Sequence, residues 1–305
     1  MVQAHRIKTV ALLGCTAVGK SATALKLAER FDGELIGADS MQIYRGFDIG
    51  TGKLTAAECG GITHRLIDIV DGDAEFSVGE YVELAKNAIQ DAAARGKLPI
   101  IVGGTGLYVY SLLSGCNFAD APRDDGVRNA LKADSHFLGA AVMHALLDKV
   151  DKRSADGIAV NDVKRTVRAL EIFAVGGAPK SAAAVKAEPP FDALTIVLTL
   201  PRELLYSRID ARVRKMFDDG LEDEVRSLMR YKDCGSMQAL GYKQIAEAPT
   251  APRCVTEPLV ARKTRNYAKR QTTYFKNMKL DKQFIDARDY AELFSRVSEF
   301  LEESK

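Results

Sequence analysis

The chain has 305 residues, of which 47% are hydrophobic and 28% are charged, and its formal net charge is +2. These values are typical of a globular chain of one large or two modest domains, and the charge alone argues neither for nor against nucleic acid. Five scattered cysteines without a C-x-x-C pair do not fit a disulfide framework or a zinc site. The N-terminus has no signal-peptide layout, and the longest apolar run is too short to span a bilayer, so we expect a cytoplasmic protein without a membrane partner.

The first element is an apolar run from Val10 to Leu13, which predicts a buried strand and leads into Gly-Cys-Thr-Ala-Val-Gly-Lys-Ser. This octapeptide satisfies Gly-x-x-x-x-Gly-Lys-[Ser/Thr], the phosphate-binding loop, and a helical pattern follows it. Glycines let such a loop curl so that its N–H groups face a phosphate, while the helix N-terminus and Lys20 add positive charge. The motif indicates a di- or triphosphate, with ATP as the default occupant. The residues expected to bind it are Gly14, Cys15, Thr16, Ala17, Val18, Gly19, Lys20 and Ser21.

Strand-like and helix-like patterns then alternate, which predicts an α/β fold with a P-loop NTPase-like parallel sheet flanked by helices, begun by residues 1–118. The expected elements are a strand at 35–38, a helix at 78–95, a strand at 99–102 and an apolar helix through Leu113. In parallel sheets, ligands bind beyond the carboxyl ends of the strands. We therefore expect the loops at 14–21, 39–42 and 103–106 to converge on one site.

A change of pattern at residues 119–191 predicts a helical insertion domain between strands of the sheet. Its candidate core positions are Leu131, Leu138, Val142, Leu146, Leu147, Val163, Val167 and Leu170. A strand at 194–198 returns to the sheet, so residues 192–305 are expected to complete the core.

The C-terminal part contains two notable helices. Residues 202–217 are amphipathic, and a polar segment at 237–244 is typical of a functional surface. A long helix at 257–279 follows, and residues 256–282 hold eight Lys or Arg against Glu257 and Asp281. Such a helix is either a solvated basic face or, with its interleaved tyrosines, a surface for nucleic acid.

Asp39 follows the second strand and is the second candidate for chemistry. A carboxylate in this place could hold Mg²⁺ directly or through water, could act as a general base, or could cap a turn. Spacing alone does not choose among these roles.

Blocks in order along nearly the whole chain resemble the tRNA dimethylallyltransferase family, also known as tRNA isopentenyltransferases or IPP transferases. They are residues 14–21, 39–44, 48–53, 64–68, 103–108, 161–162, 168–171, 209–213, 241–243 and 264–271. The chain departs from the family at Cys15 and Val18, where Pro and Ser are usual, and near 151–154, where an Asp-Pro pair is lost.

The resemblance implies a prenyl transferase that moves the dimethylallyl group from dimethylallyl diphosphate to the N6 amine of the adenine 3′-adjacent to the anticodon. It implies that the loop holds the diphosphate of this donor and that Asp39 accepts the proton of the amine. Thr16, Lys20 and Arg212 would stabilise the departing pyrophosphate, with Arg208 as a competing candidate, and Ser21 would ligate Mg²⁺ as the cofactor.

The family further implies that the chain binds the tRNA anticodon stem-loop and extrudes the target base, and separately we expect a monomer. The implied contacts are Asp39, Ser40, Met41, Gln42, Thr105, Arg128, Lys164, Arg165, Thr166, Val167, Arg168, Gln238, Gly241, Tyr242, Lys243, Arg265, Lys269 and Arg270. Two alternatives stay open. An isopentenyltransferase acting on free adenylate would need neither the basic helix nor the insertion, and a small-molecule P-loop kinase would turn over ATP beneath an arginine-rich lid.

Overall fold

The computed structural model describes residues 6–115, 123–181 and 188–303. The chain divides into two compact units, one formed by Met1–Leu113 together with Pro189–Lys305 and the other by Ser114–Glu188. The second unit therefore begins and ends a few residues earlier than the insertion predicted at 119–191.

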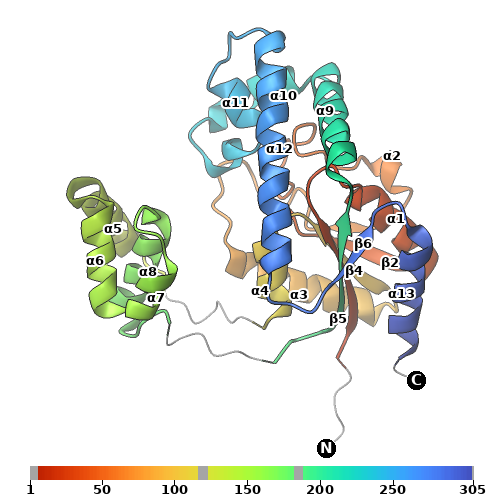
Figure 1. Cartoon of the computed structure of the whole chain (residues 1–305), viewed down its shortest axis with the longest axis horizontal. Helices are drawn as coiled ribbons and strands as arrows, with labels where there is room; N and C mark the ends of the chain where they lie inside the picture. The colour runs from red at the N-terminus through yellow and green to blue at the C-terminus, as the bar shows by residue number, and fades with distance from the viewer. Residues whose placement is uncertain (1–5, 116–122, 182–187, 304–305) are drawn as a thin grey trace, which may run out of the picture. The chain divides into compact units, whose positions relative to one another are not determined.

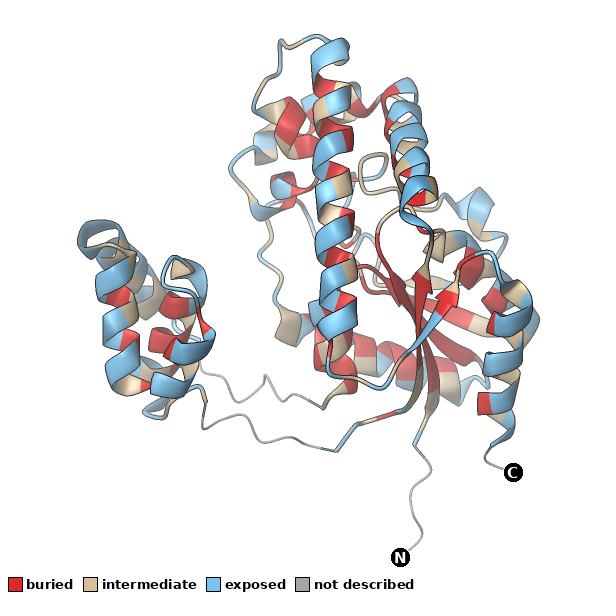
Figure 2. Ribbon diagram, in the orientation of Figure 1, coloured by how far each residue is buried: buried red, intermediate tan, exposed pale blue. Residues whose placement is uncertain are grey.

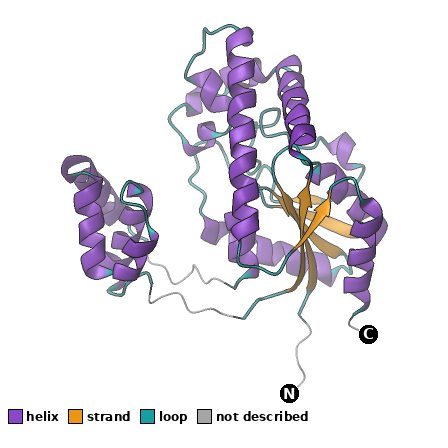
Figure 3. Cartoon of the chain, in the orientation of Figure 1, coloured by secondary structure: helices purple, strands orange, loops and turns teal. Residues whose placement is uncertain are grey.

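A six-stranded sheet forms the centre of the first unit, and every strand pairs with its neighbours in parallel (Figure 3). The strand order is β3-β2-β4-β1-β5-β6. The strands are β1 (Lys8–Gly14), β2 (Gly33–Gly37), β3 (His64–Arg65), β4 (Leu98–Gly103), β5 (Asp192–Thr199) and β6 (Gln283–Asp286). The prediction of a parallel α/β sheet is confirmed, and the short edge strands β3 and β6 are additions to it.

Helices cover both faces of this sheet (Figure 1). Their bounds are α1 (Lys20–Phe31), α2 (Ala56–Cys59), α3 (Val78–Ala94), α4 (Gly106–Leu113), α9 (Arg202–Asp218), α10 (Leu221–Ser227), α11 (Tyr242–Ala246), α12 (Arg253–Asn277) and α13 (Tyr290–Glu302), with 3₁₀ turns η1 (Met229–Tyr231) and η2 (Gly235–Gln238). α1 and α13 lie on one side of the sheet, and α3 and α4 lie on the other. For α1 and α3 this follows from right-handed crossovers, because the chain moves one way across the sheet from β1 to β2 and the opposite way from β3 to β4.

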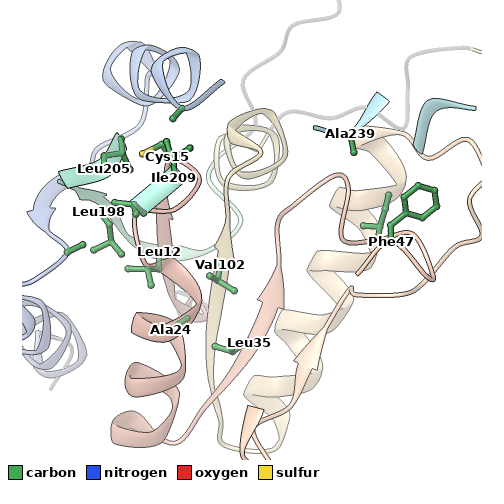
Figure 4. Close-up of a cluster of buried hydrophobic side chains, with 14 of the residues drawn as sticks. Leu12, Cys15, Ala24, Leu35, Phe47, Val102, Leu198, Leu205, Ile209 and Ala239 are labelled. Carbon is green, nitrogen blue, oxygen red and sulfur yellow. The ribbon is translucent and has the colours of Figure 1, made fainter. Parts of the chain in front are cut away.

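The core of the first unit is centred on β1, in which every residue from Thr9 to Gly14 is buried. A central strand covered on both faces has no polar side, which explains its continuous apolar sequence. Figure 4 shows Leu12, Leu35, Val102 and Leu198 projecting from four neighbouring strands of the sheet. The carboxyl ends of these strands therefore rest on a close-packed base.

Within its described residues, the second unit contains four helices with a small core of their own. They are α5 (Asp125–Leu138), α6 (Ala140–Val150), α7 (Lys152–Gly157) and α8 (Val163–Gly176). The hydrophobic cluster at the centre of this core consists of Met143, Leu147, Ala155, Ile158, Val167, Ala169 and Leu170, and the partly buried Leu131 and Val163 pack against it.

The predicted core of the insertion was wrong at Leu138, Val142 and Leu146, which are 44%, 46% and 40% exposed. The inward face of α6 carries Met143 and Leu147 instead. These positions lie one residue beyond Val142 and Leu146, a rotation of about 100° around the helix axis.

Candidate functional site

The loop between β1 and α1 has the backbone that the sequence motif requires. Gly14 and Gly19 have φ values of 152° and 110°, and Ala17 has a φ of 62°. A left-handed conformation is costly for a residue with a Cβ and is found mainly where the surrounding structure enforces it. A Cβ at Gly14 would lie 2.9 Å from the Leu198 carbonyl oxygen, so β5 leaves no room for a side chain there.

Lys20 lies at the start of α1 and folds back over this loop, where its Nζ donates a hydrogen bond to the Cys15 carbonyl oxygen at 2.8 Å. Burial lowers the pKa of Lys20 to about 8, and the nearby Arg212 lowers it as well, whereas Cys15 and Asp39 oppose the shift. Desolvation disfavours the ammonium form, and an anionic ligand would restore it.

Arg212 reaches the same place from α9. Its Nη2 donates to the Thr51 carbonyl oxygen at 3.1 Å, and its guanidinium lies so close to Gly52 that a Cβ there would be 2.1 Å from Nη2. Burial lowers the pKa of Arg212, and Asp39 opposes this effect. Within the described ranges, neither Lys20 nor Arg212 forms an ion pair with a carboxylate. Two partly desolvated cations therefore meet at the loop, an arrangement suited to a bound polyanion.

Arg208, one helical turn earlier on α9, has a different role. Its Nη1 donates to the Val18 carbonyl oxygen at 3.2 Å and so braces the backbone of the loop. Hydrogen bonds from Arg288 lower the pKa of Asp286, the last residue of β6, to about 2, and the charge of Arg208 makes a small further contribution. Arg212, which is coupled to both Lys20 and Asp39, is thus the better candidate for contact with a phosphate.

Asp39 stands just beyond β2, and its Oδ1 accepts a hydrogen bond from the Met41 backbone N–H at 3.0 Å. The Asp39 side chain therefore caps the turn that follows β2, one of the roles that the sequence left open. The carboxylate also interacts electrostatically with Lys20, Arg212 and Tyr267. Burial raises the pKa of Tyr267 to about 12, and the charge of Asp39 adds to this rise.

The three loops expected to converge do so. The Thr105 backbone N–H donates to the Ala38 carbonyl oxygen at 3.0 Å, and the Ser40 N–H donates to Thr105 Oγ1 at 2.9 Å. Gln42 Nε2 donates to the carbonyl oxygens of Thr51 and Gly52 at 3.1 and 3.3 Å. Thr105 and Gln42 are therefore engaged in fixing the shape of the site.

Gln271 of α12 connects the phosphate-binding loop to the loop after β4. Its Oε1 accepts from the Thr16 N–H at 2.9 Å, and its Nε2 donates to the Gly104 carbonyl oxygen at 2.9 Å. A Cβ at Gly104 would lie 2.5 Å from this Nε2. Sequence reasoning missed this residue because its partners lie far away along the chain, although Gln271 ends one of the family-like blocks.

The residues proposed for tRNA contact differ widely in exposure. Lys164, Arg165, Gln238, Lys269 and Arg270 are exposed, whereas Ser40, Met41, Gln42, Thr105, Arg128, Arg168, Lys243 and Arg265 are partly buried. On α12, Arg265 forms an ion pair with Asp210, which leaves Lys269 and Arg270 as the more accessible of the three charged residues predicted on this helix to contact tRNA. Figure 2 shows exposed residues along this helix alternating with buried ones.

Four of these residues are buried and present little or no surface for contact with tRNA. Tyr242 has no exposed surface and contacts Phe47, with ring centroids 5.0 Å apart. Thr166 and Val167 are 1% and 4% exposed, and Val167 belongs to the core of the second unit. Gly241, beside Tyr242, is buried as well.

Arg128 and Arg168 both pair with the fully buried carboxylate of Glu171, at N–O distances of 3.0 Å. Hydrogen bonds from both arginines hold the pKa of Glu171 below its usual value despite burial. Removing one partner of such a buried pair is costly, so these arginines have a structural role whatever else they bind.

Comparisons with known proteins agree with this geometry. Residues 42–278 match the model of a family described as IPP transferase. The chain belongs to the IPP transferase family. It is 43% identical to a tRNA dimethylallyltransferase of Bacillus cytotoxicus over 295 residues, which cover 95% of this chain and 93% of the relative. It is 43% identical to a tRNA dimethylallyltransferase of Roseiflexus sp. over 278 residues, or 89% and 91% of the two chains.

Solved structures of the family show the same fold. The tRNA isopentenylpyrophosphate transferase of Bacillus halodurans superimposes with a TM-score of 0.72 at 38% identity and 97% coverage of both chains. A eukaryotic dimethylallyltransferase captured acting on tRNA gives a TM-score of 0.83 at 29% identity, with 96% of this chain and 77% of that one covered. The family model begins at residue 42, so the match to it does not depend on the phosphate-binding loop at residues 14–21.

Two further observations concern metal binding and membrane crossing. In the described ranges, no cluster of three or more His, Cys, Asp or Glu side chains could hold a metal ion. Over the same ranges, no helix has the length and apolar character needed to cross a membrane.

Proposed function

We propose that this chain transfers the dimethylallyl group of dimethylallyl diphosphate to the N6 amine of the adenine 3′-adjacent to the anticodon of a tRNA, releasing diphosphate. The observation that carries the proposal is the meeting of Lys20 and Arg212, two partly desolvated cations, with Asp39 at the carboxyl edge of the sheet. Family membership supports the same reaction, because the curated relatives are tRNA dimethylallyltransferases.

The reaction needs an activated leaving group and a base. The amine nitrogen attacks the allylic carbon, the bond from that carbon to the diphosphate oxygen breaks, and negative charge grows on the pyrophosphate. Lys20, Arg212 and the N–H groups of the phosphate-binding loop stabilise this charge better in the transition state than in the bound donor. The nitrogen then carries an extra proton, which Asp39 accepts as general base.

The residues present fit Mg²⁺ bound mainly through the donor. Ser21 directly follows Lys20 at the start of α1 and offers a hydroxyl ligand. Mg²⁺ usually keeps several waters and takes phosphate oxygens beside one or two protein ligands, so the lack of an acidic cluster in the described ranges suits this mode. When bound, the ion would neutralise part of the diphosphate charge.

The basic face of α12 is proposed to grip the anticodon stem-loop. Lys269 and Arg270 are exposed, and Arg270 lies over the ring of Tyr267, 5.6 Å from its centroid. RNA loops are recognised by phosphate contacts and by stacking of splayed bases on aromatic or guanidinium groups. In the second unit, Lys164 and Arg165 offer exposed charge for the same purpose.

We further propose that the protein is a monomer located in the cytoplasm. Light scattering of the complex with tRNA would measure how many protein chains bind one tRNA.

A direct assay separates the proposal from its alternatives. The protein is incubated with labelled dimethylallyl diphosphate, MgCl₂ and either unmodified tRNA or AMP. Label should appear in tRNA at the adenine beside the anticodon. Label in AMP alone would favour the free-nucleotide enzyme, and hydrolysis of ATP with phosphorylation of a small molecule would favour the kinase.

A salt titration tests the tRNA-binding helix. Lys269→Ala combined with Arg270→Ala should weaken tRNA binding and reduce the salt slope by roughly two, because each phosphate contact contributes about one unit. Lys97→Ala is the matched control, since Lys97 pairs with Asp32 beside the start of β4, at the opposite end of the strand from the site. An unchanged slope would identify α12 as a merely solvated surface.

A further inference from the structure

The loop at residues 48–53 is anchored by a single carboxylate, that of Glu224 on α10. The backbone N–H groups of Asp48 and Ile49 donate to Glu224 Oε2 at 3.2 and 2.8 Å. The Gly50 N–H donates to Oε1 at 3.2 Å. Three consecutive peptide groups thus converge on one side chain that lies more than 170 residues away along the sequence.

Tyr242 completes this anchor from α11. Its hydroxyl donates to Glu224 Oε1 and accepts a hydrogen bond from the Gly50 N–H at 3.1 Å. A Cβ at Gly50 would lie 2.3 Å from the Tyr242 ring, so the loop rests directly on that ring. Tyr242 and Glu224 therefore fix both the position and the orientation of the loop.

The next two residues of the loop form the seat of Arg212. Thr51 accepts the 3.1 Å hydrogen bond from Arg212 Nη2, and the missing side chain at Gly52 makes room for the guanidinium. The same Thr51 carbonyl oxygen accepts from Gln42 Nε2, which fixes it from the other side. A shift at Gly50 would pass through one peptide unit to the oxygen that orients Arg212.

We infer that Glu224 and Tyr242 are positioning residues for Arg212, holding its guanidinium where it meets the pyrophosphate of the donor. The inference rests on the proposed function, in which Arg212 stabilises the leaving group. It gives the family-like block at 241–243 a role in donor binding, in place of the tRNA contact first expected of Tyr242.

A double-mutant cycle tests whether Tyr242 acts through Arg212. Inorganic pyrophosphate in MgCl₂ buffer is titrated calorimetrically into the wild type, Tyr242→Phe, Arg212→Lys and the double variant. Tyr242→Phe keeps the buried ring and removes the hydroxyl, so affinity should fall roughly three- to tenfold. In the Arg212→Lys background the same change should cost less than about twofold, because the guanidinium that the loop positions is absent. A merely structural role would give equal losses in both backgrounds and would overturn the inference.

Tyr231→Phe is the matched control, since Tyr231 also packs against Phe47, with ring centroids 6.2 Å apart, and should leave pyrophosphate affinity unchanged. Glu224→Gln provides a second variant that does not depend on the Tyr242 result, with Glu222→Gln removing the same charge from the same helix. Glu224→Gln should lower kcat/KM for the donor roughly tenfold in wild type and less than about twofold beside Arg212→Lys. Loss of tRNA affinity in Tyr242→Phe, with pyrophosphate affinity intact, would also overturn the inference.

The two proposals fail in different ways. If the wild type binds pyrophosphate but transfers no label to tRNA, the proposed function fails and the binding cycle still decides the role of Tyr242. If the wild type transfers label and the cycle is additive, only the positioning role fails. If pyrophosphate does not bind at all, the inference falls with the placement of Arg212.

Discussion

Replacing Gln271 by methionine removes two hydrogen bonds while keeping a side chain of similar length. The Thr16 N–H and the Gly104 carbonyl oxygen each lose a partner. Gln271 is only 6% exposed, so water replaces it poorly at both groups. A buried polar group left without a partner costs about 1–3 kcal/mol, and the half-buried Thr16 lies at the low end of that range. We expect a loss of about 2–4 kcal/mol in the free energy of unfolding.

Part of this loss should appear as weaker binding of the donor. The phosphate-binding loop of the variant must be ordered by its ligand, and an ordering cost of about 1.4 kcal/mol raises the dissociation constant for pyrophosphate about tenfold. Urea denaturation monitored by circular dichroism measures the first effect, and calorimetric titration of pyrophosphate measures the second. Thr273→Ala is the control, because Thr273 is exposed two residues further along the same helix.

Gln271→Glu sharpens the test. It retains an acceptor for the Thr16 N–H but places a carboxylate oxygen against the Gly104 carbonyl oxygen and adds negative charge beside the phosphate site. It should therefore bind pyrophosphate more weakly than Gln271→Met does. The reasoning is refuted if Gln271→Met behaves like Thr273→Ala in both measurements.

Three further predictions concern charge at the site. Asp39→Ala should lower turnover by roughly two to four decades with pyrophosphate affinity largely kept, and unchanged single-turnover rates would remove Asp39 from the base role. Arg212→Ala should lower kcat/KM for the donor far more than Arg208→Ala does. Arg208→Ala should chiefly lower the melting temperature, because Arg208 braces the backbone of the loop. A larger loss of kcat/KM in Arg208→Ala would assign the phosphate contact to Arg208. With a pKa of about 8, Lys20 is half in its ammonium form at that pH and almost fully so one pH unit lower. Pyrophosphate affinity should therefore be constant below about pH 7 and fall by up to about tenfold per pH unit above 8, and Lys20 should take up a proton when pyrophosphate binds. Calorimetry in buffers of different ionisation enthalpy measures this proton uptake. An affinity that stays constant up to about pH 9.5 would contradict the prediction.

The parts of the fold that sequence could predict are those with a strong local pattern. β1, β4 and β5 are apolar runs because they lie between helices, and α9 and α12 are long enough for their periodicity to be clear. β3 spans two residues and β6 spans four at the edges of the sheet, where short and partly polar segments suffice. Edge strands bury less surface, and so leave a weaker hydrophobic signal.

The site divides in the same way. Asp39 and the loop that leads to Lys20 each come after a strand, so the meeting of the two side chains could be predicted from parallel-sheet geometry. Gln271, Glu224 and Tyr242 act through contacts that span from 18 to 255 residues of sequence. A tyrosine between glycine and lysine looks the same in sequence whether it faces solvent or a buried carboxylate. The sequence therefore predicts an exposed Tyr242, whereas the structure buries it.

The strand order has a consequence for how this protein emerges from the ribosome. β1 is made first, yet one of its two partners, β5, begins only at Asp192, after the whole second unit has been synthesised. At about 5–20 residues per second, the roughly 185 residues from the end of β1 to the end of β5 take about 10–40 s, during which one edge of β1 has no neighbour. During that interval the nascent chain exposes the unpaired backbone groups of an apolar strand, which can bind chaperones or pair wrongly with another copy of the chain. The rate of translation through the second unit should therefore influence the yield of folded protein.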